Sequence, residues 1–252
     1  MDNVKVFAYY ALHYGYEWLE WSMKSIKDFV DQIYVFYTPR PSYGHATKLV
    51  NPDSIFLDVM KDVAAKFDAR WINVESQISW EGQHRDFAVN WLDKDGADLI
   101  LVVDADEIWA PEHLNHAILQ ASRVPTEVYR VYMRHFWRSL EWVCDDPAAP
   151  ARIINPKFRD GREGYIGIDK VYHMGYAQRP ELIHYKMDIH GHKGEIRPNW
   201  FRDKFMSWRP NIGIDDVHPT NVDFWNPRPY IDDGELQELV GDHPYWGLDI
   251  ID

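Results

Sequence analysis

Hydrophobic residues along the first half of the chain alternate between short continuous runs and helical spacing. The segments 4–10 and 32–37 are apolar, aromatic runs typical of buried strands. Between them, apolar side chains at positions 19, 23, 26 and 30 predict one face of a helix. The same alternation predicts strands over 70–74 and 97–103, and helices over 53–67, over 83–92 and from 111 onward.

Local signals mark the ends of these segments. Pro39, Pro41 and Gly44 predict a loop after the second strand, and Pro111 suits the first turn of a helix. Asp53 and Ser54 are the expected caps of the second helix. Repeated strand and helix units of this length predict an α/β fold with a mainly parallel central sheet flanked by helices. In such sheets, ligands bind at the carboxyl ends of the strands.

The pattern changes after residue 124. Strand-like segments at 127–133 and 151–155 are joined by connections rich in Gly and Pro, and the tail 218–252 is dense in Pro, Trp and Tyr. The sequence contains no repeat, low-complexity tract or long linker. We therefore expect one domain over 1–252, in which residues 125–252 elaborate the first half and the tail forms a strap across the surface.

Composition narrows the classes of partner and location. The 27 basic and 40 acidic residues give a formal charge of −13, which disfavours nonspecific attraction to nucleic acid or an anionic membrane. The single cysteine, Cys144, excludes an internal disulfide, and the sequence has neither an N-terminal signal-type segment nor a long apolar span. A cytoplasmic protein without a membrane span is the expectation. Twelve Trp, fifteen Tyr and eleven Phe suggest that some aromatic rings line a pocket.

Two carboxylates follow the most apolar strand. Asp104 and Asp106 come directly after the run 97–103, and residues i and i+2 of an extended segment point the same way. Because desolvating two carboxylates is costly without a cation, a shared divalent metal is expected, with a diphosphate supplying its other ligands. A strand that simply ends in an acidic loop is the alternative.

In its context, this acidic pair resembles the DxD motif of GT-A-fold nucleotide-sugar glycosyltransferases, close to the family 2-like enzymes often found in bacterial and phage genomes. The resemblance covers most of the chain. It implies a GT-A-like fold in which residues 1–124 bind the nucleotide sugar and residues 125–252 face the acceptor. The segments that carry it are 17–21, 82–86, 103–107, 151–154 and 171–176.

The resemblance also implies a metal site. Asp106 would ligate Mn²⁺ or Mg²⁺, Asp104 would hold the ribose or the metal shell, and His173 would complete the site. Because carboxylates suit either ion and an imidazole suits Mn²⁺, this mixed set favours Mn²⁺. His190 and His192, two positions apart, are the competing pair.

Donor-binding residues follow from the same resemblance. Arg85, in the first turn of a predicted helix, could hold a phosphate or the edge of the base, and Tyr10 could stack on the nucleobase. Lys186 could neutralise the diphosphate leaving group. Many relatives hold uracil with an acidic residue after the second strand, and the segment 37–40 has none, so the donor base stays open.

An inverting transfer also needs a carboxylate near the acceptor hydroxyl as general base. Asp169, shortly before the late histidine, is the first candidate, and it joins Asp104 and Asp106 as the expected catalytic residues. Asp146 and Glu141 are the alternatives. The stereochemical outcome stays open.

The expected function is metal-dependent transfer of a sugar from a nucleoside-diphosphate sugar to a hydroxyl of a glycan, a lipid-linked glycan, a small molecule or a hydroxylated DNA base. The acidic charge makes DNA the less expected acceptor, although the local cluster Arg130, Arg134 and Arg138 leaves it open. The alternatives are an aspartyl-nucleophile phosphatase that uses Asp104 and a non-catalytic carbohydrate-binding protein. The phosphatase motif usually lies near the start of its chain, whereas the run that leads to Asp104 begins only at residue 97.

Overall fold

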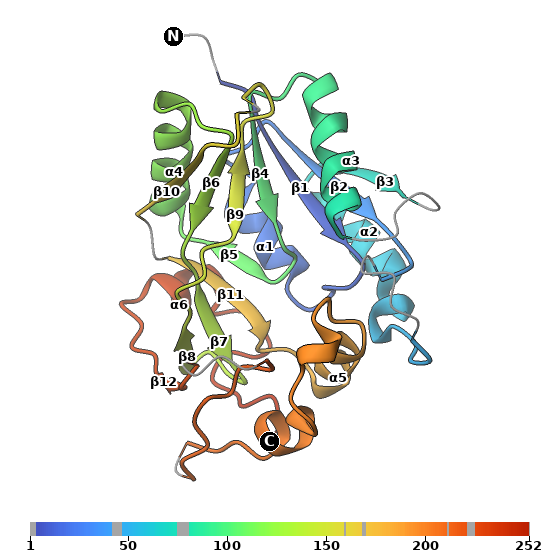
Figure 1. Ribbon diagram of the computed structural model, residues 1–252, viewed down its shortest axis with the longest axis vertical. Coiled ribbons are helices and arrows are strands. Elements are labelled where there is room, and N and C mark those ends of the chain that lie inside the picture. Colours follow the sequence, from blue (N-terminus) through green and yellow to red (C-terminus); the bar gives the residue numbers. More distant parts are fainter. Residues whose placement is uncertain are drawn as a thin grey trace.

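The computed structural model describes residues 4–41, 47–74, 81–158, 160–167, 170–210, 212–220 and 225–251. Within these ranges, the strands form two sheets (Figure 1). The larger sheet carries helices on its faces, and the smaller sheet lies beyond one end of the larger sheet's strands.

The larger sheet is mainly parallel. Its strands are β1 (Val6–Leu12), β2 (Gln32–Tyr37), β3 (Arg70–Asn73), β4 (Leu99–Val103), β6 (Val128–Val131), β9 (Ala151–Ile154) and β10 (Glu163–Ile166). In the described part of the chain they lie in the order β10-β6-β9-β4-β1-β2-β3. The neighbouring pairs β3–β2, β2–β1 and β1–β4 are parallel, and β9 runs antiparallel to both β4 and β6. The predicted α/β class with a mainly parallel central sheet is confirmed.

Helices cover both faces of this sheet. They are α1 (Leu19–Ile26), α2 (Leu57–Lys66) and α4 (Pro111–Arg123) on one face and α3 (Glu81–Lys94) on the other. Two further helices, α5 (Pro180–Asp188) and α6 (Glu235–Val240), pack with the smaller sheet. On β1, Ala8 and Tyr10 face α1, α2 and α4, whereas Phe7 and Tyr9 face α3. Burial on both sides explains why this strand is apolar throughout. Within the described ranges, none of the helices combines the length and the apolar composition needed to cross a bilayer.

The strand order reverses at β1. The chain passes from β1 to β2 and β3 on one side and then returns to β4 on the other side. The carboxyl ends of β1 and β4 therefore flank the topological switch point, where ligands of open α/β sheets bind. Because Asp104 follows β4 directly, the acidic pair lies at this switch point.

The chain enters the smaller sheet shortly after β4. Its strands are β5 (Glu107–Trp109), β7 (Arg134–Trp137), β8 (Trp142–Asp145), β11 (Val171–Tyr176) and β12 (Arg228–Pro229), in the order β12-β8-β7-β11-β5 among the described residues. Because β5 begins three residues after Asp104 and pairs with β11, this sheet brings residues of the second half next to the acidic pair. The predicted elaboration of the first half is therefore largely a second sheet.

Aromatic side chains form a separate core beneath the smaller sheet. Trp137 packs edge-to-face against Trp200 and Trp208, with ring centroids 6.0 and 6.4 Å apart. Trp225 is buried in the same cluster and packs against Tyr176. Much of the aromatic content that suggested a lined pocket is used to fill this core.

The C-terminal tail contributes to the interior of the protein. In α6, Leu236 and Val240 are fully buried. His243 stacks on Trp18 with ring centroids 3.6 Å apart, and its Nε2 hydrogen-bonds the carbonyl oxygen of Glu17. The tail, predicted as a strap, covers apolar side chains of α1 and the smaller sheet and buries part of its own residues.

The three arginines considered for a DNA acceptor do not form a basic patch. Arg138 is fully buried, Arg130 pairs with Glu163 at 2.7 Å, and Arg134 packs over the ring of Tyr230. Each guanidinium is used locally, so this part of the DNA expectation is wrong.

Arg138 instead anchors the tail. Its Nη2 donates to both carboxylate oxygens of Asp249 at 2.7 Å, and its Nη1 donates to the carbonyl oxygens of Phe205 and Trp208. A buried guanidinium is stable only with such compensation.

Replacing Arg138 by Met should lower the free energy of unfolding by about 3–5 kcal/mol, because it removes one partner of a buried ion pair. Urea denaturation followed by tryptophan fluorescence measures this change. Arg228→Met is the matched control, since Arg228 and Asp145 form a pair whose side chains are 52% and 69% exposed. The control should lose less than about 1 kcal/mol. Equal losses in the two variants would contradict the anchoring role of Arg138.

Candidate active site

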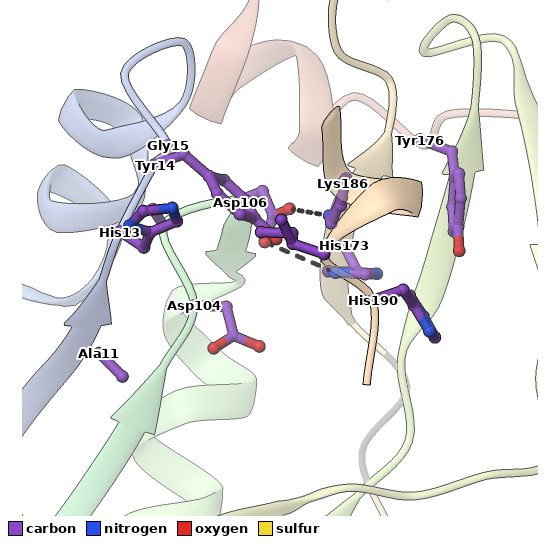
Figure 2. Close-up of a pocket in the computed structure, with 12 residues that line it drawn as sticks. Ala11, His13, Tyr14, Gly15, Asp104, Asp106, His173, Tyr176, Lys186 and His190 are labelled. Atoms are coloured by element: carbon purple, nitrogen blue, oxygen red, sulfur yellow. Dashed lines mark hydrogen bonds and ion pairs between the residues drawn. The ribbon is translucent and has the colours of Figure 1, made fainter. Parts of the chain in front are cut away.

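The chain turns immediately after β4. The amide of Glu107 donates to the carbonyl oxygen of Asp104 at 3.0 Å, which closes a β-turn over 104–107. The expectation that Asp104 and Asp106 extend the strand and point the same way is therefore wrong. In Figure 2, the two carboxylates lie in different parts of the pocket.

Arg152 holds Asp104. It lies on β9, the antiparallel neighbour of β4, and its Nη2 donates to Asp104 Oδ2 at 2.6 Å and to Glu107 Oε1. The side chains of Arg152 and Glu107 are buried, whereas that of Asp104 is 47% exposed. One carboxylate oxygen of Asp104 is thus fixed by the protein, and the side chain borders the pocket.

Asp106 is the buried carboxylate of the site, with 6% of the residue exposed. Its Oδ2 accepts from Gln178 Nε2 at 2.7 Å and from Lys186 Nζ at 3.1 Å, and its Oδ1 lies 3.5 Å from His173 Nε2. Burial by itself would raise the pKa of Asp106, but the Lys186 ammonium and the His173 imidazole hold this pKa well below its usual range. Asp106 is therefore ionised, with Oδ2 bound by two donors and Oδ1 directed at His173.

Lys186 reaches Asp106 from α5, the helix that follows β11. Its ammonium lies 5.6 and 5.9 Å from the ring centroids of Tyr14 and Tyr176. Burial would lower the pKa of Lys186, yet the Asp106 carboxylate raises this pKa above its ordinary value. The pocket therefore contains a positive charge held by one carboxylate and two aromatic faces.

His173 lies on β11, directly opposite Glu107 of β5. A Cβ built on Gly175 would lie 2.3 Å from His173 Cε1. Because residues i and i+2 share one face of a strand, the missing side chain at Gly175 leaves room for the imidazole. This close approach is the physical reason for a glycine two residues after the histidine.

The loop after β1 forms the opposite wall of the pocket. Gly15 has a φ of +133°, and a Cβ there would lie 2.3 Å from Ala105 Cβ, so a glycine lets this loop approach the acidic turn. Asp53 braces the loop by accepting the amides of Gly15 and Tyr16 at 2.7 and 3.0 Å. The Asp53 carboxylate also pairs with Arg179 from the start of α5.

Asp53 does not cap a helix as predicted. The cap of the 3₁₀ helix Pro52–Phe56 is Asn51, whose side chain accepts the Asp53 amide at 2.9 Å. The Asp53 side chain is fully buried, because its carboxylate is needed by the loop after β1.

These walls enclose a pocket of about 300 Å³ at the switch point. It collects residues from the ends of β1 and β4, from β11 and from α5 with the segment that follows it (Figure 2). The residues that line it are Ala11, His13, Tyr14, Gly15, Asp104, Ala105, Asp106, His173, Tyr176, Lys186, Ile189 and His190.

The competing histidines separate. His190 lines the pocket, whereas the His192 side chain is 64% exposed and pairs with Glu195. Burial and the positive charge of Lys186 lower the pKa of His190 to about 4, so its ring is neutral at pH 7. The amide of His192 donates to His190 Nδ1 at 3.1 Å, which leaves the ring hydrogen of His190 on Nε2. His190 thus offers an N–H donor, and the two histidines do not form a metal-binding pair.

Two residues expected at the donor lie outside the pocket lining. Tyr10 is fully buried under α1, with its hydroxyl 3.0 Å from Ser22 Oγ, so its predicted stacking on a nucleobase is wrong. Arg85 lies on α3. Burial raises the pKa of the Tyr9 hydroxyl, the Arg85 charge lowers this pKa and the Asp104 charge raises it, so Arg85 and Asp104 both act on the same ring. Its donor-binding role stays a prediction.

The general-base candidates are scattered. Asp169 lies outside the described residues, and Glu141 is exposed. Asp146 is largely buried, and its Oδ2 lies 3.9 Å from His135 Nε2. Within the described residues, neither Glu141 nor Asp146 borders the pocket.

Sequence reasoning missed Arg152, Gln178 and Asp53. An arginine between apolar residues in the strand-like segment 151–155 was a usable signal for Arg152, because a buried guanidinium needs an acidic partner. Gln178 and Asp53 gave no comparable signal, since their partners lie 72 and 38 residues away.

The residues present fit a divalent cation held by two side chains. Ligands about 2.1 Å from one ion lie about 3–3.5 Å from each other, and Asp106 Oδ1 is 3.5 Å from His173 Nε2. In the described part of the chain, no group of three or more His, Cys, Asp or Glu side chains is arranged to hold an ion. The predicted set of Asp104, Asp106 and His173 is therefore not assembled. Two protein ligands completed by substrate oxygens suit Mg²⁺ or Mn²⁺.

No protein-family model matches the chain, and no curated protein matches its sequence. Three solved structures represent its structural neighbours. For 4-diphosphocytidyl-2C-methyl-D-erythritol synthase from Anaerococcus prevotii, identity is 13% and the TM-score 0.43 over 73% of this chain and 97% of the other. Residues 1–349 of TarS from S. aureus are 12% identical to the chain, with a TM-score of 0.43. This match covers 68% of the chain and 60% of the TarS fragment.

Glucosyl-3-phosphoglycerate synthase from Mycobacterium tuberculosis, in complex with Mn²⁺, uridine diphosphate and phosphoglyceric acid, is similar at 13% identity and a TM-score of 0.36. This match covers 53% of the chain and 44% of the synthase, so the chain spans less than half the length of that protein. Likeness at this level concerns the fold alone and assigns no activity.

Gly175→Ala should displace the His173 ring, because the added methyl would overlap its Cε1. We expect a loss of about 1–3 kcal/mol in the free energy of unfolding, as for other overpacked sites. Gly194→Ala is the control, since a Cβ at Gly194 meets nothing within 4 Å. Chemical denaturation of the two variants tests this, and a Gly175→Ala protein as stable as wild type would contradict the close approach.

Proposed function

We propose that this chain is a metal-dependent glycosyltransferase that moves a sugar from a nucleoside-diphosphate sugar to an acceptor hydroxyl. One observation carries the proposal. An ionised buried carboxylate, Asp106, meets an imidazole, His173, and a positively charged Lys186 at the switch point of a mainly parallel sheet. This combination suits a ligand that carries a diphosphate.

The chemistry depends on charge that develops on the leaving diphosphate. Donors that are already in place in a pocket shielded from water stabilise such charge without reorganisation. Lys186 meets this condition, because Asp106 and two tyrosine rings hold its ammonium. His190 adds a neutral N–H donor in the same pocket.

A bound divalent cation would supply Lewis-acid charge to the diphosphate oxygens. Asp106 Oδ1 and His173 Nε2 are its proposed protein ligands. Asp104, whose Oδ2 is fixed by Arg152, is proposed to accept a hydrogen bond from the ribose or from a water of the cation's shell. Asp169 remains the proposed general base.

The geometry disfavours the alternative phosphatase. An aspartyl nucleophile needs a free carboxylate oxygen aimed at the phosphorus and a second acid beside it. Asp106, the second acid of the motif, does not lie beside Asp104, because it occupies a different part of the pocket and is bound by Lys186. A non-catalytic sugar-binding protein would have no need to keep a buried charged pair in its pocket, since such a pair costs desolvation energy.

A thermal-shift screen tests the proposal directly. Nucleoside diphosphates and nucleotide sugars with each of the common bases are added with and without Mn²⁺, because a bound donor raises the unfolding temperature by mass action. The proposal predicts a shift for one base that needs both the diphosphate and the cation, followed by slow release of nucleoside diphosphate from the matching sugar donor. Release of inorganic phosphate instead would favour the phosphatase, and no shift with any donor would contradict the proposal.

Asp106→Asn should lower donor turnover by about 100-fold or more, because it removes the negative charge that holds both Lys186 and the cation. Turnover is measured as release of nucleoside diphosphate at saturating Mn²⁺. Asp98→Asn is the matched control, since Asp98 precedes β4 at its opposite end and pairs there with Lys157. Wild-type turnover in Asp106→Asn would disprove the assignment.

His173→Ala should raise the Mn²⁺ concentration needed for half-maximal donor binding, by about 10-fold or more, because a lost ligand weakens the metal site directly. His192→Ala should leave this concentration unchanged, since its side chain is exposed. His190→Ala should weaken donor binding at saturating Mn²⁺ without changing the metal dependence. A larger metal effect at His190 than at His173 would transfer the ligand role to the segment 190–192.

A further inference from the structure

A second histidine lies directly against His173. His135 on β7 is the register partner of His173 in the parallel pair of β7 and β11. The two imidazoles meet at their Nδ1 atoms, 2.8 Å apart, with their rings nearly perpendicular. His135 was not among the residues that the sequence singled out.

Only one hydrogen can lie between these two nitrogens. An Nδ1–Nδ1 distance of 2.8 Å is a hydrogen bond, so one ring donates and the other accepts. If His135 donates, the hydrogen of a neutral His173 lies on Nε2 and faces Asp106 Oδ1. If His173 donates, its Nε2 presents a lone pair to the same place.

The surroundings of His135 keep its ring in position. The ring packs against Trp225, with centroids 4.9 Å apart, and only 8% of the residue is exposed. His135 Nε2 is buried without a hydrogen-bond partner and lies 3.9 Å from Asp146 Oδ2. A hydrogen on His135 Nε2 would be attracted by the Asp146 carboxylate. A lone pair on the same atom would be repelled by it.

We propose that His135 is a positioning residue in the cation-bound site, where it accepts the Nδ1–H of His173 and so leaves the Nε2 lone pair of His173 to the divalent cation. The hydrogen of His135 then lies on Nε2, opposite Asp146, which completes the row Asp106, His173, His135 and Asp146. Metal-binding histidines commonly donate their second N–H to a fixed acceptor, which sets the tautomer and the ring orientation. This inference rests on the proposed metal site.

Nitrogen NMR of ¹⁵N-histidine-labelled wild-type protein tests the tautomers, with Mg²⁺ and uridine diphosphate or the base selected by thermal shift. Mg²⁺ is used because it is diamagnetic. The expected result is a protonated Nδ1 on His173 and a protonated Nε2 on His135. The opposite assignment for the two rings would overturn the proposal, and this test needs no variant to fold.

Mn²⁺ affinity, measured by calorimetry in the presence of the same nucleotide, tests the role energetically. His135→Phe keeps the ring volume but removes the acceptor, and we expect Mn²⁺ affinity to fall 10- to 100-fold. His135→Asn should recover most of the affinity, because its Oδ1 can accept the same Nδ1–H. Asp146→Asn should cause a smaller loss than His135→Phe.

His218→Phe is the matched control. His218 packs on the same Trp225 ring, with centroids 4.5 Å apart, but its Nδ1 bonds Thr220. The His218→Phe variant should bind Mn²⁺ with the affinity of the wild-type protein. Equal affinity in His135→Phe and wild type would overturn the inference while leaving the metal site intact, whereas a wild-type protein that binds no Mn²⁺ would overturn the metal site and the inference together.

Discussion

The ionised carboxylate of Asp106 is the constraint on which the rest of the site depends. A buried carboxylate is stable only when donors and positive charge surround it. Gln178, Lys186 and His173 provide these from three positions on and after β11, more than sixty residues along the chain. The smaller sheet exists in the right place because β5 leaves the acidic turn and pairs with β11.

Two close backbone approaches shape the space around this carboxylate. The missing side chain at Gly15 lets the loop after β1 contact the acidic turn, and the missing side chain at Gly175 makes room for the His173 ring. Asp53 then braces the loop through the Gly15 amide, and Arg152 fixes the far side of the turn through Asp104. The pocket is therefore held by contacts between segments that are distant in sequence, which favours a preformed site over one that assembles on binding.

Opposite charges and aromatic faces around Lys186 explain how the site tolerates a buried ammonium. Lys186 is neutralised by Asp106 on one side and contacts two aromatic faces on the other, so it can remain charged in a buried place. The contact between His135 and His173 extends the site away from the pocket through one hydrogen bond between the two rings.

The alternation of apolar runs and helical spacing in the sequence determined the α/β class and the position of the acidic pair after β4. A strand buried on two faces is apolar throughout, and a helix buried on one face repeats apolar residues every three or four positions, so both patterns can be recognised from short segments. The resemblance, in turn, singled out His173 and Lys186, whose side chains line the same pocket as Asp106. The direction of each side chain was decided only by the tertiary structure. Asp104 and Asp106 separate because a turn replaces the extended strand, and Tyr10 lies under α1. The partners of the buried carboxylate come from strands and helices whose pairing depends on contacts across the whole chain, and such contacts leave no periodic trace in the sequence.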